Sequence, residues 1–275
     1  MRRKNVMLAS KFNAKRLATW PTPHILQPKI NGRRALAYFD GSGRVSLRSS
    51  EDHSISSLPT LIASLESLNL SNITLDGELY NKQLSLQRIS AIVSPTTRIH
   101  PDEALIRYYC FDVINDQPQF LRIAALSALL QRANEQIVHV SSVISGNLNE
   151  NLALFLGCGY EGIIIRHTNG IYQPLRSTYM MKLKLRTSGS FPIVDFYEEL
   201  TQYGEPKNSL GSFELRAPNG QLFKVGTGFT RQQRDDFWQM DASYLLLLKA
   251  RILYQELSDR GVPIFPVFVA AEEPV

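Results

Sequence analysis

The sequence predicts an α+β protein in which antiparallel strands, joined by tight turns, are interspersed with a few amphipathic helices. Two turn signals indicate hairpins, D-G-S-G at 40–43 and P-N-G at 218–220, and each lies between runs of alternating character. Two leucine-rich segments, 58–68 and 124–136, carry apolar residues at helical spacing. With 275 residues, the chain is long enough for two modest domains.

In the first part of the chain, alternation predicts strands and leucine spacing predicts one helix. The strands are expected at 35–39, 45–49, 74–80 and 105–114. The helix between the second and third strands should begin near Pro59, because proline is favoured at the first helical position. Three prolines in residues 1–28 disfavour a helix in that segment.

The middle of the chain is expected to hold two more helices and two more strands. The helices cover 124–136 and the residues that end at Gly157, and the strands cover 161–166 and 179–185. Alternation in the second of these strands puts Lys182 and Lys184 on the same face. Turn-forming residues at 186–190 then predict a linker between two domains.

Beyond the linker the chain is rich in strand signals. Strands flank the turn at 218–220, and Thr230 with Gln233 forms a capping box that begins a short helix. Periodicity alone leaves 244–257 open between helix and strand.

The composition describes a globular protein with an anionic partner. Hydrophobic residues make up 44% and charged residues 20%, which excludes a disordered chain, and the net charge of +5 favours nucleic acid. No apolar run is long enough for a signal peptide or a membrane span. Cys110 and Cys158 fit the reduced thiols of a cytoplasmic protein, although a single disulfide between them stays open.

A basic segment, Q-P-K-I-N-G-R-R at 27–34, is the strongest candidate for chemistry. Its lysine, Lys29, follows a proline and precedes a glycine turn, and Arg33 and Arg34 lie just behind it. One interpretation is a solvated basic turn. The other is a site for a polyanion, in which neighbouring cations lower the pKa of a lysine and make its amine a nucleophile.

Three other kinds of site are disfavoured. The G-x-G-x-x-G at 157–162 follows a helix and precedes a strand, which is the reverse of a dinucleotide site, and Lys182 occupies the place of the acidic residue. No G-x-x-x-x-G-K-S/T is present for a phosphate-binding loop. The two cysteines and five histidines have no spacing typical of zinc ligands, and neither cysteine has a histidine nearby in sequence.

Six short motifs in a fixed order resemble those of the ATP-dependent DNA ligases, within the covalent nucleotidyltransferase superfamily. The segment from Lys29 to Arg34 resembles K-x-D-G-x-R. The other five motifs are Arg48-Ser49, Asp76-Gly77-Glu78, Phe111-Asp112, Glu161-Gly162-Ile163-Ile164-Ile165-Arg166 and Lys182-Leu183-Lys184. A single such motif is weak evidence, whereas the ordered series over about 160 residues is specific.

The resemblance implies a role for each matching residue. Lys29 would be the nucleophile that forms lysyl-AMP from ATP, with Lys182 and Lys184 as further catalytic residues. Phosphates and ribose would be held by Lys182, Lys184, Arg34 and Arg48. Phe111 would stack on adenine, and Gln27 lies where the family reads the base edge. Glu161 and Glu78 would bind Mg²⁺ (or Mn²⁺) or the ribose hydroxyls.

The C-terminal part is similar to the oligonucleotide-binding (OB) barrel of DNA ligases, from Gly211-Ser212 to Phe268. The resemblance implies a nucleotidyltransferase domain over 1–187 and an OB-fold domain over 188–275, with 250–256 as a strand. It further implies a minimal, monomeric, ATP-dependent ligase that seals nicked duplex DNA, with a viral or phage source. Two alternatives stay open, an RNA or mixed RNA/DNA ligase and a non-catalytic nucleic-acid-binding relative.

The sequence departs from the family pattern in two places. Asn31 replaces the usual aspartate two residues after Lys29. The C-terminal segment 269–275 lacks the basic residues of the family's last motif, and Ile264 stands where an arginine is common. Self-adenylylation is therefore expected to be slow, or arginines elsewhere compensate.

Overall fold

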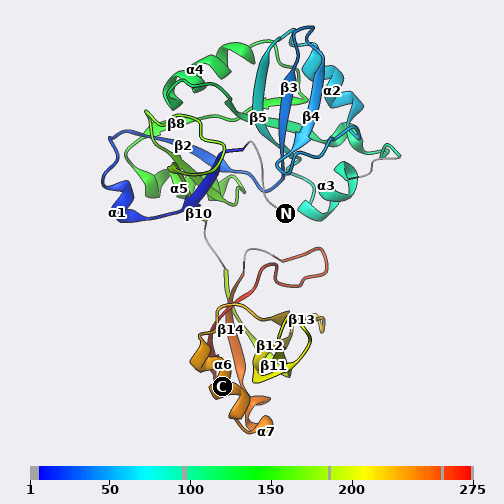
Figure 1. Ribbon diagram of the computed structural model, residues 1–275, viewed down its shortest axis with the longest axis vertical. Coiled ribbons are helices and arrows are strands. Elements are labelled where there is room, and N and C mark those ends of the chain that lie inside the picture. Colours follow the sequence, from blue (N-terminus) through cyan, green and yellow to red (C-terminus); the bar gives the residue numbers. More distant parts are fainter. Residues whose placement is uncertain (1–5, 95–97, 185–186, 255–256, 274–275) are drawn as a thin grey trace. The chain divides into compact units, whose positions relative to one another are not determined.

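The computed structural model describes residues 6–94, 98–184, 187–254 and 257–273. The chain divides into two compact units, Met1–Lys184 and Leu185–Val275. Figure 1 shows the first unit with two sheets, β2, β8 and β10 gathering with α1 and α5, and β3, β4 and β5 with α2 and α3. None of the helices in the described ranges combines the length and apolar character needed to cross a bilayer.

The first sheet of unit 1 has the strand order β1-β10-β9-β2-β8. Its strands are β1 (Leu8–Lys11), β10 (Arg176–Lys184), β9 (Gly162–Arg166), β2 (His24–Lys29) and β8 (Val143–Ser145), and the helices in this part are α1 (Ala14–Leu17) and α5 (Leu148–Gly157). One face packs Leu26, Ile163 and Met181 against Phe155 of α5 and Trp20. Because side chains alternate along a strand, the neighbours of these residues point to the opposite, polar face.

Strand register places the lysines of this sheet side by side on the polar face. Gly162 of β9 lies between Lys29 of β2 and Lys184 of β10, and Ile164 lies between Gln27 and Lys182. The narrow glycine therefore separates two lysines that are 155 positions apart in sequence.

The second sheet of unit 1 has the order β4-β3-β5-β6-β7. Its strands are β3 (Arg33–Phe39), β4 (Val45–Ser49), β5 (Ile73–Tyr80), β6 (Arg107–Val113) and β7 (Ile137–His139). The helices in this part are α2 (Pro59–Glu66), α3 (Leu86–Val93), the 3-10 helix η1 (Glu103–Leu105) and α4 (Gln119–Leu129). Ala35, Leu47 and Leu75 face a core completed by Leu61 of α2 and Ile89 of α3. The opposite face, which carries Arg34 and Asp76, is polar.

Unit 2 is a five-stranded antiparallel sheet with the order β13-β12-β11-β14-β15 and two helices. The elements are β11 (Thr187–Leu200), β12 (Pro206–Arg216), β13 (Leu222–Val225), α6 (Arg231–Gln239), α7 (Ala242–Leu245), β14 (Lys249–Tyr254) and β15 (Val267–Glu272). Phe213 packs edge-on against Phe229, Phe237 and Phe268, with ring centroids 5.2–5.9 Å apart.

The predicted α+β class is confirmed, and most predicted strands form where alternation indicated. The strand expected at 250–256 is β14, whose last residue is Tyr254, while residues 255 and 256 lie outside the described part of the chain. The capping box of Thr230 and Gln233 is also present.

Three expectations were wrong in detail. The helix expected at 124–136 is α4, which begins at Gln119 after Pro118 and ends at Leu129, because a turn at Asn134 leads into β7. Residues 187–190 of the segment expected to be a linker belong to strand β11 and pair with β14. Arg186, the first residue of that segment, lies outside the described residues. A short helix, α1, forms within 1–28, before the first of the three prolines. The Asn13 side chain caps this helix by accepting from the backbone N–H of Arg16.

The glycine of the D-G-E motif is required by packing. A Cβ atom on Gly77 would lie 2.6 Å from the ring of buried Tyr108 and 2.8 Å from the Tyr109 carbonyl oxygen. We therefore expect Gly77→Ala to lower the free energy of unfolding by about 1–3 kcal/mol, as overpacking does. Gly146→Ala, at a site with no atom within 4 Å, is the matched control and should change it by less than about 0.5 kcal/mol in chemical denaturation. Equal effects of the two changes would contradict this explanation.

Candidate functional site

The polar faces of the two sheets of unit 1 are joined by side-chain hydrogen bonds. Gln27 of β2 donates to the Phe111 carbonyl of β6 over 3.0 Å, and Arg166 of β9 donates to Asp112 over 2.7 Å. The Tyr172 hydroxyl, in the β9–β10 connection, donates to Asp76 of β5 over 2.6 Å. The residues that the motifs place on different strands therefore meet in one region between the sheets.

A lysine cluster occupies the first sheet's side of this region. Both oxygens of Glu161 are engaged, Oε2 by the Lys29 ammonium and Oε1 by Lys184 over 2.8 Å. Glu161 is only 8% exposed, whereas Lys29 and Lys184 retain 20% and 23%. A single carboxylate thus holds two lysines whose side chains remain partly exposed.

Lys182 completes the cluster. Burial, and then the positive charges of Lys29 and Lys184, lower the pKa of Lys182 from its ordinary value. The attraction of Glu161 acts in the opposite direction but is weaker. The cluster therefore carries more positive charge than its carboxylate balances, which suits a phosphate-bearing ligand.

An arginine–aspartate pair lies on the second sheet's side. The Arg34 guanidinium binds Asp76 with two hydrogen bonds, one of them 2.8 Å long from Nε. Asp76 is fully buried and Arg34 is 15% exposed. Burial alone would lower the pKa of Arg34, but the Asp76 carboxylate outweighs it and raises that pKa, so the arginine stays charged.

Two guanidinium groups lie near the Phe111 ring. Arg34 and Arg166 approach its centroid to 5.1 and 5.5 Å, within the range of cation–π attraction. Gln27 is buried, and its amide donates to Phe111 and Ser142 and accepts from Arg166 over 2.6 Å. The backbone of Phe111 is therefore held by the first sheet, while its ring lies near arginines of both sheets.

Behind Phe111, one carboxylate holds two buried arginines. Asp112 accepts from Arg122 Nε over 2.8 Å and from Arg166 over 2.7 Å, and all three side chains are at most 3% exposed. Arg122 also donates to the carbonyl oxygens of Gln117 and Gly170. This network connects α4, β6 and β9.

Two predicted residues lie at the margin of the site. Leu36 of β3 lies between Arg48 of β4 and Asp76 of β5, so the side chains of Arg48 and Asp76 are on the same face of the sheet. Arg48 is nevertheless 44% exposed, and its ion-pair partner is Asp52 at 3.0 Å. Glu78 of β5 lies opposite Arg34 and is partly buried. Among the residues described, no group of three or more His, Cys, Asp or Glu side chains lies close enough together to hold a metal ion by itself.

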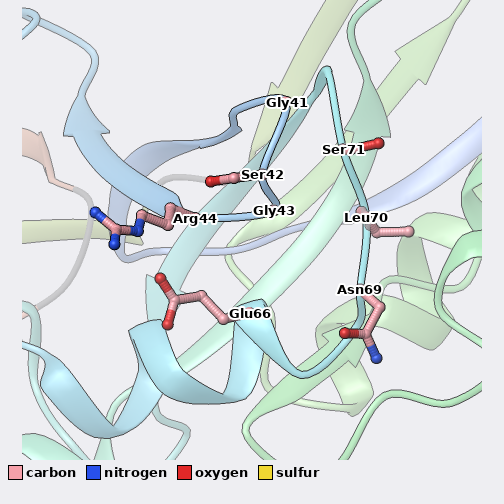
Figure 2. A pocket seen from close by; sticks show the side chains of 8 residues that line it. All are labelled: Gly41, Ser42, Gly43, Arg44, Glu66, Asn69, Leu70 and Ser71. Carbon is pink, nitrogen blue, oxygen red and sulfur yellow. The ribbon is translucent and has the colours of Figure 1, made fainter.

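A separate hollow of about 390 Å³ lies at the far end of β3 from Arg34. Figure 2 shows its lining by the turn at 41–44 and by Glu66 and residues 69–71 beyond α2. None of the residues predicted from the motifs lines this hollow, so it is distinct from the lysine cluster.

Sequence reasoning missed several residues that build the site. Arg122 had a usable signal, because it lies one turn before Leu126 on the buried side of α4, where a charge needs a partner. Arg166 ends an apolar strand and offered a similar signal. Tyr172 belongs to none of the motifs, and only the fold brings it to Asp76.

Comparisons with known proteins agree with the geometry. Residues 6–184 match the family described as ATP dependent DNA ligase domain, and residues 203–271 match the DNA ligase OB-like domain. A DNA ligase of African swine fever virus is 29% identical over 279 residues, which cover 92% of this chain and 64% of the relative. A DNA ligase of Haemophilus influenzae is 25% identical over 167 residues, 59% of this chain and 60% of that one. The chain therefore spans less than two thirds of the length of these relatives.

Solved structures share the fold over nearly the whole chain. A Lig E DNA ligase, described as binding DNA with a minimal scaffold, has a TM-score of 0.78 at 22% identity and covers 98% of this chain and 99% of its own. The Chlorella virus DNA ligase-adenylate has a TM-score of 0.56 at 24% identity, with full coverage of both chains. The ligase of bacteriophage T7 in complex with ATP has a TM-score of 0.56 at 17% identity and covers 96% and 98%. The predicted pairing of a nucleotidyltransferase fold with an OB domain is confirmed.

Proposed function

This chain belongs to the ATP-dependent DNA ligase family, and we propose that it joins a 3′-hydroxyl to a 5′-phosphate at nicks in duplex DNA through a lysyl-AMP intermediate. The observation that carries the proposal is the lysine cluster, in which Lys29 and Lys184 pair with the two oxygens of Glu161 and lie on a sheet joined by hydrogen bonds to the one that carries Arg34 and Phe111. A lysine that attacks a phosphate needs neighbouring cations that bind the phosphate groups.

The proposed reaction has three steps. The Lys29 ammonium first gives up a proton, which the Oε2 atom of Glu161 lies in place to accept. The neutral amine then attacks the α-phosphorus of ATP, and the P–N bond forms as the P–O bond to pyrophosphate breaks and a second proton leaves the nitrogen for solvent. The AMP then passes to the 5′-phosphate of the nick as the P–N bond breaks. Finally the 3′-hydroxyl attacks that phosphate and AMP leaves. Each step exchanges one phosphorus substituent, so positioning and charge stabilisation are the main demands on the protein.

The remaining residues are proposed to position ATP. Phe111 would stack on adenine, and Lys182, Lys184, Arg34 and Arg48 would hold phosphates and ribose. Gln27 would read the base edge, and its amide is already engaged by the Phe111 carbonyl, Ser142 and Arg166, so one of these hydrogen bonds would have to be exchanged for the base.

Glu161 and Glu78 have the hard oxygen donors that Mg²⁺ prefers; because lysines engage both oxygens of Glu161, these carboxylates would hold the ion only together with substrate phosphates and water. When bound, Mg²⁺ would neutralise charge on the phosphates of ATP. Unit 2, with its match to the OB-like ligase domain, is proposed to contact the DNA backbone, a role that requires no reading of sequence.

Incubation with α-labelled ATP and Mg²⁺, followed by a denaturing gel, tests the proposal. We expect a covalently labelled protein and, with unlabelled ATP, sealing of a nicked DNA duplex. Nicks with DNA or RNA on the 3′-hydroxyl side distinguish the alternatives, since a strict requirement for RNA there would replace the DNA assignment. The absence of both labelling and sealing would favour a non-catalytic binding protein.

The lowered pKa of Lys182 gives the reaction a predicted pH dependence. The ammonium loses its proton, and with it the attraction for phosphate, at a lower pH than an ordinary lysine does. The KM for ATP in self-adenylylation should therefore rise, by roughly tenfold, as pH increases through that pKa. Lys182→Arg, which stays charged, should flatten this rise, and Lys15→Arg on the exposed surface of α1 should not. An unchanged alkaline rise in Lys182→Arg would remove Lys182 from ATP binding.

A further inference from the structure

Tyr172 occupies a buried position that none of the motifs includes. It lies in the connection between β9 and β10 and is 8% exposed. Its hydroxyl donates to Asp76 Oδ2 over 2.6 Å and accepts from the backbone N–H of Met7 over 3.1 Å. The hydroxyl thus has a defined donor and a defined acceptor, and it touches the carboxylate that holds Arg34.

We propose that Tyr172 is a positioning residue that sets, through Asp76, the place of the Arg34 guanidinium relative to the lysine cluster. The inference rests on the proposed function, in which Arg34 and the lysines bind the same ATP molecule.

The topology explains why such a link is needed. Arg34 and Asp76 belong to the second sheet, whereas Lys29, Lys182 and Lys184 belong to the first. Tyr172 comes from a connection of the first sheet, so its hydrogen bond to Asp76 ties the arginine-bearing strands to the lysine-bearing ones. A ligand held by both groups requires that their separation be fixed.

The connection that carries Tyr172 is itself anchored. Arg122 of α4 donates to the Gly170 carbonyl over 3.0 Å, and the backbone N–H of Leu8 donates to Leu175 over 2.8 Å. The Arg122 guanidinium also lies 5.7 Å from the centroid of the Tyr172 ring. The chain is therefore anchored before and after Tyr172, and its ring contacts Arg122.

The hydrogen bond between Tyr172 and Asp76 is expected to persist. Asp76 is fully buried and accepts from Arg34 Nε, Arg34 Nη2 and Tyr172. Burial, and then the Asp76 charge, raise the pKa of Tyr172 above its ordinary value, so the hydroxyl keeps its proton and remains a donor. Removing the hydroxyl would leave the buried carboxylate with Arg34 as its side-chain partner among the described residues, so the pair could shift together.

Tyr172→Phe tests the inference with the loss of one oxygen atom, and Tyr108→Phe is its matched control. Tyr108 is also buried, and its hydroxyl donates to the carbonyls of Ala35 and Leu75 on the core side of the second sheet. We expect Tyr172→Phe to raise both the KM for ATP in self-adenylylation and the Kd for ATP in calorimetry by about tenfold, with a small change in kcat. Tyr108→Phe should lower Tm by about as much as Tyr172→Phe does, but it should leave the KM and Kd for ATP at wild-type values.

The outcomes separate this inference from the proposed function. A labelled wild type together with an unchanged KM and Kd in Tyr172→Phe would overturn the inference alone. Equal increases in both variants would also overturn it, because the effect would then follow from the loss of any buried hydroxyl. A wild type that binds ATP but takes no label would contradict the proposed function, while the calorimetric comparison would still decide the role of Tyr172. A wild type that neither binds ATP nor takes label would overturn both.

Discussion

Lys29→Ala should lower the rate of covalent AMP labelling by at least about 10⁴-fold, the scale on which loss of a catalytic nucleophile is felt. No other lysine of the cluster can substitute readily, because Lys184 is held by the other oxygen of Glu161 and Lys182 lies two register pairs further along the strands. The measurement is single-turnover labelling with α-labelled ATP and Mg²⁺. Lys15→Ala, at an exposed position on α1, is the matched lysine deletion and should label as the wild type does.

A second substrate makes this prediction sharper. A nick whose 5′-phosphate already carries AMP needs no lysine nucleophile, because only the attack of the 3′-hydroxyl remains. Lys29→Ala should therefore seal the pre-adenylylated nick while failing on an ordinary nick with ATP. Persistent labelling of Lys29→Ala would contradict the role of Lys29. Failure on both nicks by a folded variant would indicate that Lys29 does more than form the covalent intermediate.

Lys29 and the motif residues that meet around it could be predicted from sequence because each motif is a continuous stretch with a local signal. Lys182 and Lys184 alternate along one strand, so their common face followed from period-two geometry alone. Gly77 separates two carboxylate-bearing positions and could be recognised as a motif, but the reason for the glycine, the ring of Tyr108 behind it, comes from a strand 31 residues later. Local pattern identifies such residues without explaining them.

The partners within the site could not be predicted in the same way. Glu161 was expected to bind a metal or ribose, but its ion pairs with Lys29 and Lys184 depend on the pairing of β2, β9 and β10, which no local pattern specifies. Tyr172 reaches Asp76 from a connection without motif or periodicity. The linker expected at 186–190 failed for a related reason, since small polar residues that resemble a turn are accepted in β11 when β14 supplies their hydrogen bonds.

The other large effect is expected in the buried network behind Phe111. Asp112→Asn keeps the shape of the side chain but removes the negative charge that faces Arg122 and Arg166, and breaking one partner of a buried ion pair costs roughly 3–5 kcal/mol. We expect a decrease of that size in the free energy of unfolding of unit 1, measured by urea denaturation. Asp102→Asn is the control, because Asp102 pairs with Arg88 at the surface, where the two side chains are 36% and 48% exposed, and the cost should stay below about 1 kcal/mol.

The comparison isolates the charge rather than the number of hydrogen bonds. Arg122 keeps the carbonyls of Gln117 and Gly170 as acceptors when Asp112 is neutral, and Arg166 keeps the amide oxygens of Gln27 and Gln119. A large difference between the two variants would therefore arise from two guanidinium groups left without a counter-charge away from water. Similar small costs for both variants would mean that the neutral acceptors are enough to satisfy the two arginines. Asp112 would then orient the side chains around Phe111 more than it stabilises the fold.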